Sequence, residues 1–259
     1  MEFDGSQGII GKGAQADVFR YQGYAYKVYK NTYPAEWIAF EKDQQRAVNQ
    51  AGLCKVRYYD TDDAHIIKMD LIEGEELEKK VLSGYIEGFG ILADAFRKVH
   101  EAPIEDIKMP PLIATAGMGL SEDEQNKIFP IIERLSEKYP SCICHLDMHF
   151  LNIMLPKEAP DAEKASSDEK TFPEYVIIDW MNARIAPAVF DYARTYVIFD
   201  EFSKEGLAIY KQVIADDIKA LGISDEDFQD AVTVCAIIRN RERELSSIRE
   251  DGLPSDRKS

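Results

Sequence analysis

The chain has 259 residues, with 31 lysines and arginines against 47 aspartates and glutamates, and a net charge of −16. Such a surface repels nucleic acid and anionic membranes, which excludes both as expected partners, and it would suit a cationic substrate. Acidity that serves solubility alone remains the alternative explanation. No apolar run reaches the length of a membrane span, and the first residues lack the basic and apolar regions of a signal peptide. We therefore expect a cytoplasmic protein.

The first part of the chain alternates between apolar and polar residues, which predicts strands. We expect them within residues 8–20 on either side of a glycine turn, and at 24–29, 56–59 and 65–72. Helical spacing from Glu36 to Ala51, stopped by Gly52, predicts one helix. Residues 1–72 are therefore predicted to form a small, mainly antiparallel sheet with one helix.

The remainder of the chain is predicted to be mostly helical. Helices are expected from 77 to 139, with breaks at Pro103 and at Pro110–Pro111, and from 190 to 250. Ser121 and Glu124 have the spacing of a capping box. Short strands are expected at 142–147, 152–155 and 175–179, and a solvated loop at 156–174. The chain as a whole is predicted to be an α+β protein of two lobes, residues 1–72 and 73–259.

Four cysteines agree with a reducing compartment. Cys54 and Cys235 are isolated, while Cys142 and Cys144 form a Cys-x-Cys in a strand-like run. No second cysteine pair completes a zinc site. We therefore predict reduced, buried thiols rather than a metal site or disulfides.

The candidate chemistry lies between residues 145 and 179. His145-x-Asp147 is followed by four residues and Asn152, and a later apolar strand ends in Asp179. Phosphoryl transfer needs a carboxylate near the acceptor hydroxyl and oxygen ligands that hold Mg²⁺ on a triphosphate. The spacing matches the catalytic-loop pattern of kinases. It predicts Asp147 as the base, and Asn152 and Asp179 as the metal ligands.

The first lobe supplies candidate nucleotide-binding residues. Gly11 and Gly13 lie between two predicted strands, where backbone amides can approach phosphates, although hairpin turns also need glycine. Lys27 lies in the next strand, as a phosphate-pairing lysine would, and Glu41 lies in the following helix, where it could pair with Lys27. Each residue alone has an ordinary structural explanation. Their order along the chain is that of a kinase.

With these motifs, the chain resembles the aminoglycoside phosphotransferase family, which is similar to choline kinases and shares the protein-kinase fold. His145-Leu-Asp-Met-His149-Phe-Leu-Asn152 is similar to that family's H-x-D-x-H-x-x-N, and Val176-Ile-Ile-Asp-Trp180 to its metal-binding strand. Phe190-Asp-Tyr-Ala-Arg-Thr195 resembles the aspartate-bearing helix that follows. The resemblance covers about residues 8–200. Two departures are Ala16 in place of a third glycine, and Ile185-Ala-Pro187 in place of Gly-Asp-Pro.

The resemblance implies a kinase-like fold that binds ATP and Mg²⁺ and phosphorylates a hydroxyl of a small molecule. It implies that the backbone of Met69, Asp70, Leu71 and Ile72 reads adenine, although these residues could equally be an ordinary last strand. We expect His145 to be a scaffold that hydrogen-bonds backbone around the loop. For His149, a place in the lining of the acceptor site and a purely structural role both stay open. Asp191 is expected to brace the catalytic loop.

The acceptor is the open question. An aminoglycoside-like antibiotic, an amino-alcohol and a sugar all remain, and the oligomeric state is unknown. The rival hypotheses are a nucleotide-binding regulatory protein with a kinase fold and little turnover, and a protein kinase. Intact Lys27, Asp147, Asn152 and Asp179 argue against the first. His149, and the lack of an Ala-Pro-Glu-like anchor after Asp179, argue against the second.

Overall fold

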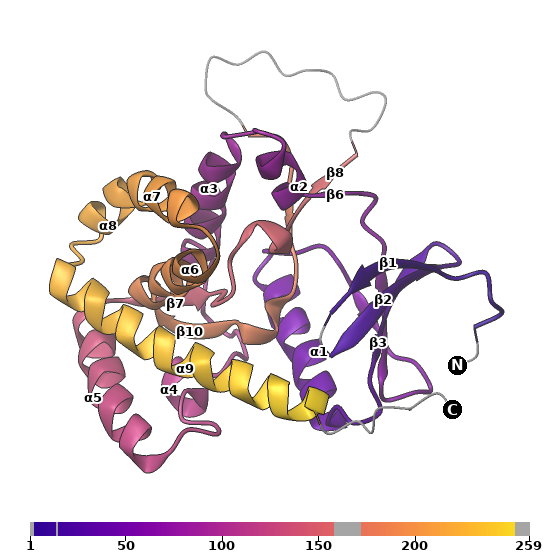
Figure 1. Ribbon diagram of the computed structural model, residues 1–259, viewed down its shortest axis with the longest axis horizontal. Coiled ribbons are helices and arrows are strands. Elements are labelled where there is room, and N and C mark those ends of the chain that lie inside the picture. Colours follow the sequence, from indigo (N-terminus) through magenta and orange to yellow (C-terminus); the bar gives the residue numbers. More distant parts are fainter. Residues whose placement is uncertain (1–2, 14, 158–171, 252–259) are drawn as a thin grey trace. The chain divides into compact units, whose positions relative to one another are not determined.

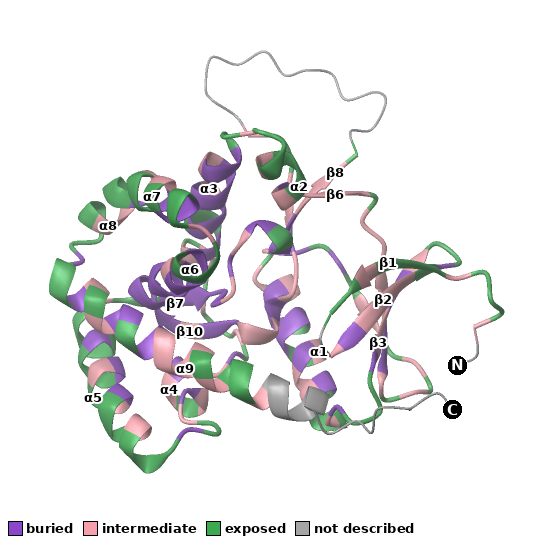
Figure 2. Ribbon diagram, viewed as in Figure 1, coloured by how far each residue is buried: buried purple, intermediate pink, exposed green. Residues whose placement is uncertain are grey.

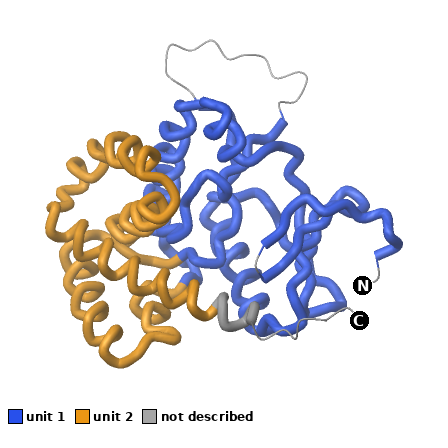
Figure 3. The backbone as a smooth tube through the Cα atoms, in the orientation of Figure 1, with its two compact units in different colours: residues 1–109, 142–183 blue, residues 110–141, 184–259 orange. Residues whose placement is uncertain are grey.

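The structure, a computed structural model, describes residues 3–13, 15–157 and 172–251, with side chains as far as residue 245. The chain divides into two compact units, Met1–Met109 with Cys142–Ala183, and Pro110–Ser141 with Arg184–Ser259 (Figure 3). The boundary that we expect at residue 72 separates lobes rather than these units, and it stays a prediction. None of the helices in the described ranges is long and apolar enough to cross a membrane.

The first unit begins with a five-stranded antiparallel sheet in the order β1-β2-β3-β5-β4 (Figure 1). Its strands are β1 Gly8–Lys12, β2 Ala16–Tyr21, β3 Tyr24–Tyr29, β4 Tyr58–Tyr59 and β5 Ile66–Asp70. The predicted strands are therefore confirmed, and β4 is shorter than expected. Its two residues are the ones that pair with β5, opposite Met69 and Lys68.

Helix α1, Ala35–Gln50, follows the predicted range closely. Its buried side chains include Ile38, Glu41, Gln45 and Val48, which recur every three or four residues and so lie on one face. Ile38 packs into an apolar cluster with residues of the sheet and of the β3–α1 connection. The buried members of that cluster are Ala16, Tyr29, Tyr33, Ile38 and Ile67. This packing fixes the helix beside β3.

The rest of the first unit carries the segments that are predicted to be catalytic. Its elements are β6 Gly74–Glu76, α2 Leu77–Leu82, α3 Gly88–His100, β7 Ser141–Cys144, η1 Phe150–Asn152, β8 Ile153–Pro156, β9 Val176–Ile177 and η2 Trp180–Asn182. Strands β6, β8 and β9 form an antiparallel sheet in that order. Strand β6 was not predicted from the sequence. Gly74 permits it, because a Cβ there would clash with the Leu155 carbonyl oxygen.

The second unit is helical around α6. Its elements are α4 Leu112–Thr115, α5 Glu122–Lys138, β10 Arg184–Pro187, α6 Ala188–Phe202, α7 Lys204–Val213, α8 Ala215–Ala220 and α9 Asp225–Asp251. Eleven of the fifteen residues of α6 are buried, and the helix packs against α7 and α9 (Figure 2). The predicted capping box starts α5, with Ser121 and Glu124 bonded reciprocally. The expected α+β class is confirmed. Most of the expected loop at 156–174, and the polar tail after residue 251, lie outside the described residues.

Candidate active site

Lys27 lies in the middle strand of the large sheet, where it pairs with Val18 on one side and Ile67 on the other. Its side chain is 18% exposed, and its Nζ lies 2.8 Å from Oε1 of Glu41. The α1 face that carries Ile38 also carries Glu41, whose side chain is only 1% exposed. The ion pair considered from the sequence is therefore formed, between a strand and a helix that the apolar cluster holds together.

Two tyrosines that the sequence analysis missed complete the environment of Glu41. The Tyr29 hydroxyl donates to Oε2 of Glu41, and the Tyr58 hydroxyl lies 3.4 Å from Oε1. Tyr29 stands two residues after Lys27, so both side chains leave β3 on the same face. Burial raises the pKa of Tyr29, which keeps the hydroxyl protonated as a donor. The Glu41 carboxylate is thus fixed on both oxygens.

Asp179 is the second carboxylate near Lys27, with its Oδ1 3.6 Å from Nζ. Its backbone is left-handed, at φ 61° and ψ 64°, a conformation that aspartate adopts more readily than most residues. The next residue, Trp180, is buried and donates from Nε1 to the Ile177 carbonyl at 3.0 Å. This anchored turn leaves the Asp179 side chain 45% exposed at the end of β9.

The electrostatic balance favours a fully charged Lys27. Burial works to lower the pKa of the ammonium group, but the carboxylates of Asp179 and Glu41 outweigh it. The pKa of Lys27 is held well above its ordinary value. A permanent positive charge beside a cavity is what a phosphate-binding lysine requires.

The predicted catalytic loop follows β7 and is tied to the strand that precedes Asp179. His145 is fully buried, and its Nε2 lies 3.0 Å from the Ile178 carbonyl oxygen. Its ring also lies 4.7 Å from that of Trp180. These contacts are the scaffold role expected for His145, because they join the loop to the segment that carries Asp179.

Asn152 closes the same loop. Its Nδ2 donates to the Asp147 backbone carbonyl at 2.8 Å and lies 3.4 Å from Oδ2 of the Asp147 side chain. His149 also faces this carboxylate, with Nε2 3.6 Å from Oδ2. Because its nitrogen is engaged by Asp147, the Asn152 amide orients its oxygen elsewhere, as a hard ligand for a divalent cation. Asn152 and Asp179 thus offer the type of oxygen donors that Mg²⁺ prefers, and the metal assignment stays a prediction.

A cavity of about 220 Å³ lies beside Lys27 and Asp179 within the first unit. Side chains from both sheets of this unit line it, and most of them are apolar. The lining includes Ile10, Val18, Ala25, Cys54, Val56, Tyr58, Met154 and Ile178. Two apolar surfaces with a cation at one end fit a nucleotide, because its flat base can lie between the surfaces while its phosphates reach the lysine.

The predicted adenine-reading segment forms an edge of this cavity: Met69, Asp70, Leu71 and Ile72 all line it. Strand β5 ends at Asp70, so the peptide groups of Leu71 and Ile72 lie beyond the sheet ladder. The Asp70 side chain has a structural task, since it accepts the Arg57 N–H at 2.9 Å and the Tyr59 hydroxyl at 2.8 Å. The Asp70 backbone N–H is also engaged, because it donates to the Arg57 carbonyl at 3.1 Å.

The two predicted loop glycines differ in place. Gly11 lines the cavity, and Gly13 is not among the described residues that line it. Gly11 follows an irregularity in the pairing of β1 with β2. The Gly13 N–H donates to the Ala16 carbonyl at 2.9 Å, which closes the turn. Gly11 is thus the glycine that the geometry favours for contact with a nucleotide.

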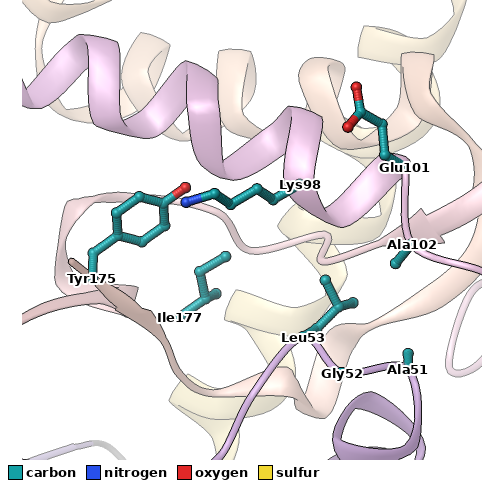
Figure 4. Close-up of a pocket in the computed structure, with 8 residues that line it drawn as sticks. All are labelled: Ala51, Gly52, Leu53, Lys98, Glu101, Ala102, Tyr175 and Ile177. Atoms are coloured by element: carbon teal, nitrogen blue, oxygen red, sulfur yellow. The ribbon is translucent and has the colours of Figure 1, made fainter. Parts of the chain in front are cut away.

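A second cavity, of about 340 Å³, lies elsewhere in the first unit (Figure 4). Its charged side chains are Lys98 and Glu101, and its described lining contains none of the predicted site residues. Lys98 is paired with Asp94 at 3.0 Å and lies over the Tyr175 ring. Although this cavity is larger, the predicted nucleotide-binding residues lie at the first one.

Comparison with known proteins gives the fold. No family model and no curated protein matches the chain. A choline/ethanolamine kinase family protein from Mesorhizobium loti is 13% identical, with 98% of this chain and 83% of that chain covered and a TM-score of 0.59. Aminoglycoside phosphotransferase APH(3'')-Id from Streptomyces rimosus is 16% identical, with 91% and 93% covered and a TM-score of 0.61. The chain has the kinase-like fold of these proteins. A third match is a thermostable mutant of aminoglycoside phosphotransferase APH(4)-Ia in a ternary complex with AMP-PNP and hygromycin B, 12% identical, with 95% and 89% covered and a TM-score of 0.59.

The resemblance stated from the motifs is confirmed at the level of fold. Identities this low carry no activity from one protein to another. What this chain does has to be argued from its own site.

Proposed function

We propose that this chain is an ATP- and Mg²⁺-dependent phosphotransferase that moves the γ-phosphate of ATP to a hydroxyl of a small molecule. One observation carries the proposal. Nζ of Lys27 lies between the carboxylates of Glu41, at 2.8 Å, and Asp179, at 3.6 Å, beside an apolar cavity. A buried cation and a half-exposed carboxylate at the end of an apolar slot are the parts that hold a metal-bound triphosphate.

The chain's own residues divide the work of binding nucleotide. Val18 and Ala25 on one side, and Met154 and Ile178 on the other, offer apolar surfaces for a base. Lys27 supplies a fixed positive charge for the phosphates, and Glu41 holds it in place. Mg²⁺, when bound through Asn152 and Asp179, would neutralise charge that develops on the transferred phosphoryl group.

Asp147 is proposed to act on the acceptor hydroxyl. Asn152 bonds to the backbone of Asp147 and contacts its side chain, which limits how the carboxylate can turn. A carboxylate held in this way orients the hydroxyl and accepts its proton as the bond to phosphorus forms. His149 lies 3.6 Å from the same carboxylate oxygen, so it is placed to contact the acceptor or to hold Asp147.

The acceptor class is proposed from charge and from the fold relatives. A net charge of −16 favours cationic acceptors over anionic ones. Proteins of the same fold are choline/ethanolamine kinases and aminoglycoside phosphotransferases, one of them seen with hygromycin B. We therefore place amino-alcohols and aminoglycoside-like antibiotics ahead of neutral sugars.

The test is a screen for ATP consumption with Mg²⁺ over aminoglycosides, other hydroxyl-bearing antibiotics, choline, ethanolamine and sugars. For an acceptor that gives turnover, Asp147→Ala should abolish nearly all activity while ATP binding stays close to normal. Asp62→Ala, in an exposed turn, is the matched control. A normal rate for Asp147→Ala would remove the base assignment.

Other outcomes distinguish the rivals. Nucleotide binding without hydrolysis or transfer to any acceptor would favour a regulatory nucleotide-binding protein. Phosphorylation of proteins in a lysate by the purified chain, abolished by Asp179→Ala, would favour a protein kinase.

A further inference from the structure

Three potential metal ligands converge in the first unit, outside the proposed active site. They are His100, the last residue of α3, and Cys142 and Cys144 on β7. The ligand atoms of these three side chains all lie within 4.8 Å of one another. Cys142 is 8% exposed and Cys144 is fully buried, while His100 is partly exposed. The two thiols of the cluster are therefore buried, and the histidine is its more exposed member.

The sulfur atoms are closer than the strand alone requires. Residues two apart on a strand have Cα atoms about 6.6 Å apart. The Sγ atoms of Cys142 and Cys144 are 3.8 Å apart, so the two side chains lean toward each other. They form no disulfide with each other.

The separations suit a tetrahedral metal. With Zn–S bonds of about 2.3 Å, two thiolates on a tetrahedral zinc lie about 3.8 Å apart, and an imidazole nitrogen lies about 3.6 Å from each sulfur. The two cysteines match the first distance as they stand. For His100, the upper limit of 4.8 Å means that its nitrogen has to move by no more than about 1.2 Å to reach the second distance.

We infer that His100, Cys142 and Cys144 form a binding site for Zn²⁺. Two thiolates and an imidazole are a ligand set for a borderline-soft cation, and they discriminate against Mg²⁺ and Ca²⁺. The sequence offered no second cysteine pair, and the fold supplies a histidine from a distant helix instead. Three protein ligands leave the fourth position of a tetrahedral ion to water or another small ligand.

The place of the site gives it a consequence for the catalytic loop. Cys144 is followed directly by His145, whose ring contacts the Ile178 carbonyl next to Asp179. Zn²⁺ would join the end of α3 to the strand that leads into this loop. Because metal binds the folded arrangement, it would also stabilise the chain against unfolding. This inference does not depend on the phosphotransferase proposal.

The experiment is a Zn²⁺ titration of the full chain, free of tags, in competition with a chromophoric chelator and with a phosphine reductant. Binding of one Zn²⁺ per chain is expected, with a rise in thermal unfolding temperature. Co²⁺ in place of Zn²⁺ should give the visible absorption of a tetrahedral ion and thiolate charge-transfer bands. Since the loss of an outer-shell partner alone costs about 10–100-fold in metal affinity, Cys142→Ser, Cys144→Ser and His100→Gln should each weaken binding at least tenfold.

The matched controls are Cys54→Ser and His65→Gln, a buried thiol and a partly exposed imidazole in the same unit. Both should bind Zn²⁺ as the unaltered chain does. The inference fails if the unaltered chain binds no Zn²⁺ more tightly than micromolar, or if Co²⁺ gives no thiolate bands, and neither result depends on a variant that folds. Equal loss in Cys54→Ser and Cys144→Ser would also overturn it.

Discussion

Lys27 and Asp227 are both charged side chains held by opposite charges, one in each compact unit. Lys27 is 18% exposed and faces Glu41 and Asp179. Asp227 is 2% exposed and faces Arg134 and Lys138. The two centres differ in how much of their charge and hydrogen-bonding capacity stays available to a ligand.

Asp227 is surrounded completely. Its two oxygens accept from Arg134 at 2.5 Å, Lys138 at 2.6 Å, Tyr139 at 2.7 Å and Ser224 at 2.8 Å. These bonds tie the start of α9 to the end of α5. Little acceptor capacity remains for a ligand, so we assign this centre to stability.

The Lys27 centre carries more negative charge than positive charge. One ammonium group faces two carboxylates, and the Asp179 side chain is 45% exposed. An excess of negative charge attracts a divalent cation, at some cost in stability, and is the imbalance that the proposed Mg²⁺ site would use. The comparison therefore predicts that changes at Lys27 reduce both turnover and stability, whereas changes at Asp227 reduce stability alone.

Lys27→Met should have the largest effect. Turnover should fall by about 10²–10³-fold, because a preorganised charge that stabilises the transferred phosphoryl group is lost. The free energy of unfolding should also fall by about 3–5 kcal/mol, because Glu41 becomes a buried carboxylate without its cation. Steady-state kinetics and urea unfolding measure the two effects.

The double variant Lys27→Met/Glu41→Gln separates them. The Gln side chain keeps an acceptor for Tyr29 and carries no charge, so most of the stability should return while activity stays lost. If activity returned with stability, the Lys27 centre would be structural, like that of Asp227.

Asp227→Asn should reduce the free energy of unfolding by about 2 kcal/mol, because charge-assisted hydrogen bonds between α5 and α9 are weakened. The kcat of the folded enzyme should not change. Asp230→Asn is the matched control, since Asp230 also pairs with Arg134 but is 37% exposed, and its loss should be much smaller. Equal losses in the two variants would show that burial of Asp227 is not what matters.

The same centre predicts a dependence of stability on pH. Hydrogen bonds from Lys138, Arg134 and Tyr139 lower the pKa of Asp227 well below its ordinary value. Its stabilisation is therefore present in full above the unfolded-state pKa of about 3.9, and is lost as the pH falls toward the folded-state pKa. The difference in unfolding free energy between the unaltered chain and Asp227→Asn should be constant from pH 7 to about 5 and should shrink below about 4. A difference that grew on acidification would contradict the lowered pKa.

Much of the fold was predictable from local patterns. Alternation in β1, β2, β3 and β5 and the helical spacing of α1 identified the large sheet and its helix. The strand β6 was missed because Gly-Glu-Glu has no apolar alternation, and its pairing depends on the approach of Gly74 to the Leu155 carbonyl oxygen. Strand β9 is shorter than expected, because the chain turns into a left-handed conformation at Asp179.

Parts of the site were predictable where the order of motifs along the chain was enough to identify the residues. The Lys27–Glu41 pair follows from such order, and the structure brings Asp179 to the same ammonium group. Contacts that depend on tertiary neighbours were not predictable. Tyr58 reaches Glu41 from β4, and His100 reaches the two cysteines from the end of α3. Tyr29 did have a signal, since it lies on the Lys27 face of β3, but nothing in the sequence shows that Glu41 accepts from it.

The smallest predicted effect concerns the two tyrosines on Glu41. The Tyr29 hydroxyl donates directly to Oε2, while the Tyr58 hydroxyl lies 3.4 Å from Oε1, near the limit of a hydrogen bond. Tyr29→Phe should therefore lower the free energy of unfolding by about 1.5 kcal/mol, and Tyr58→Phe by much less.

Their kinetics test whether Tyr29 is a positioning residue. If Tyr29 holds Glu41, and through it Lys27, then Tyr29→Phe should reduce kcat several-fold and change the KM for ATP little, because the charge on Lys27 remains. Tyr58→Phe is the matched control and should leave kcat near its original value. Equal losses of kcat in the two variants would mean that the position of Glu41 depends on packing rather than on the Tyr29 hydrogen bond. The Lys27–Glu41 pair would then resemble the Asp227 centre more closely than its excess of negative charge suggests.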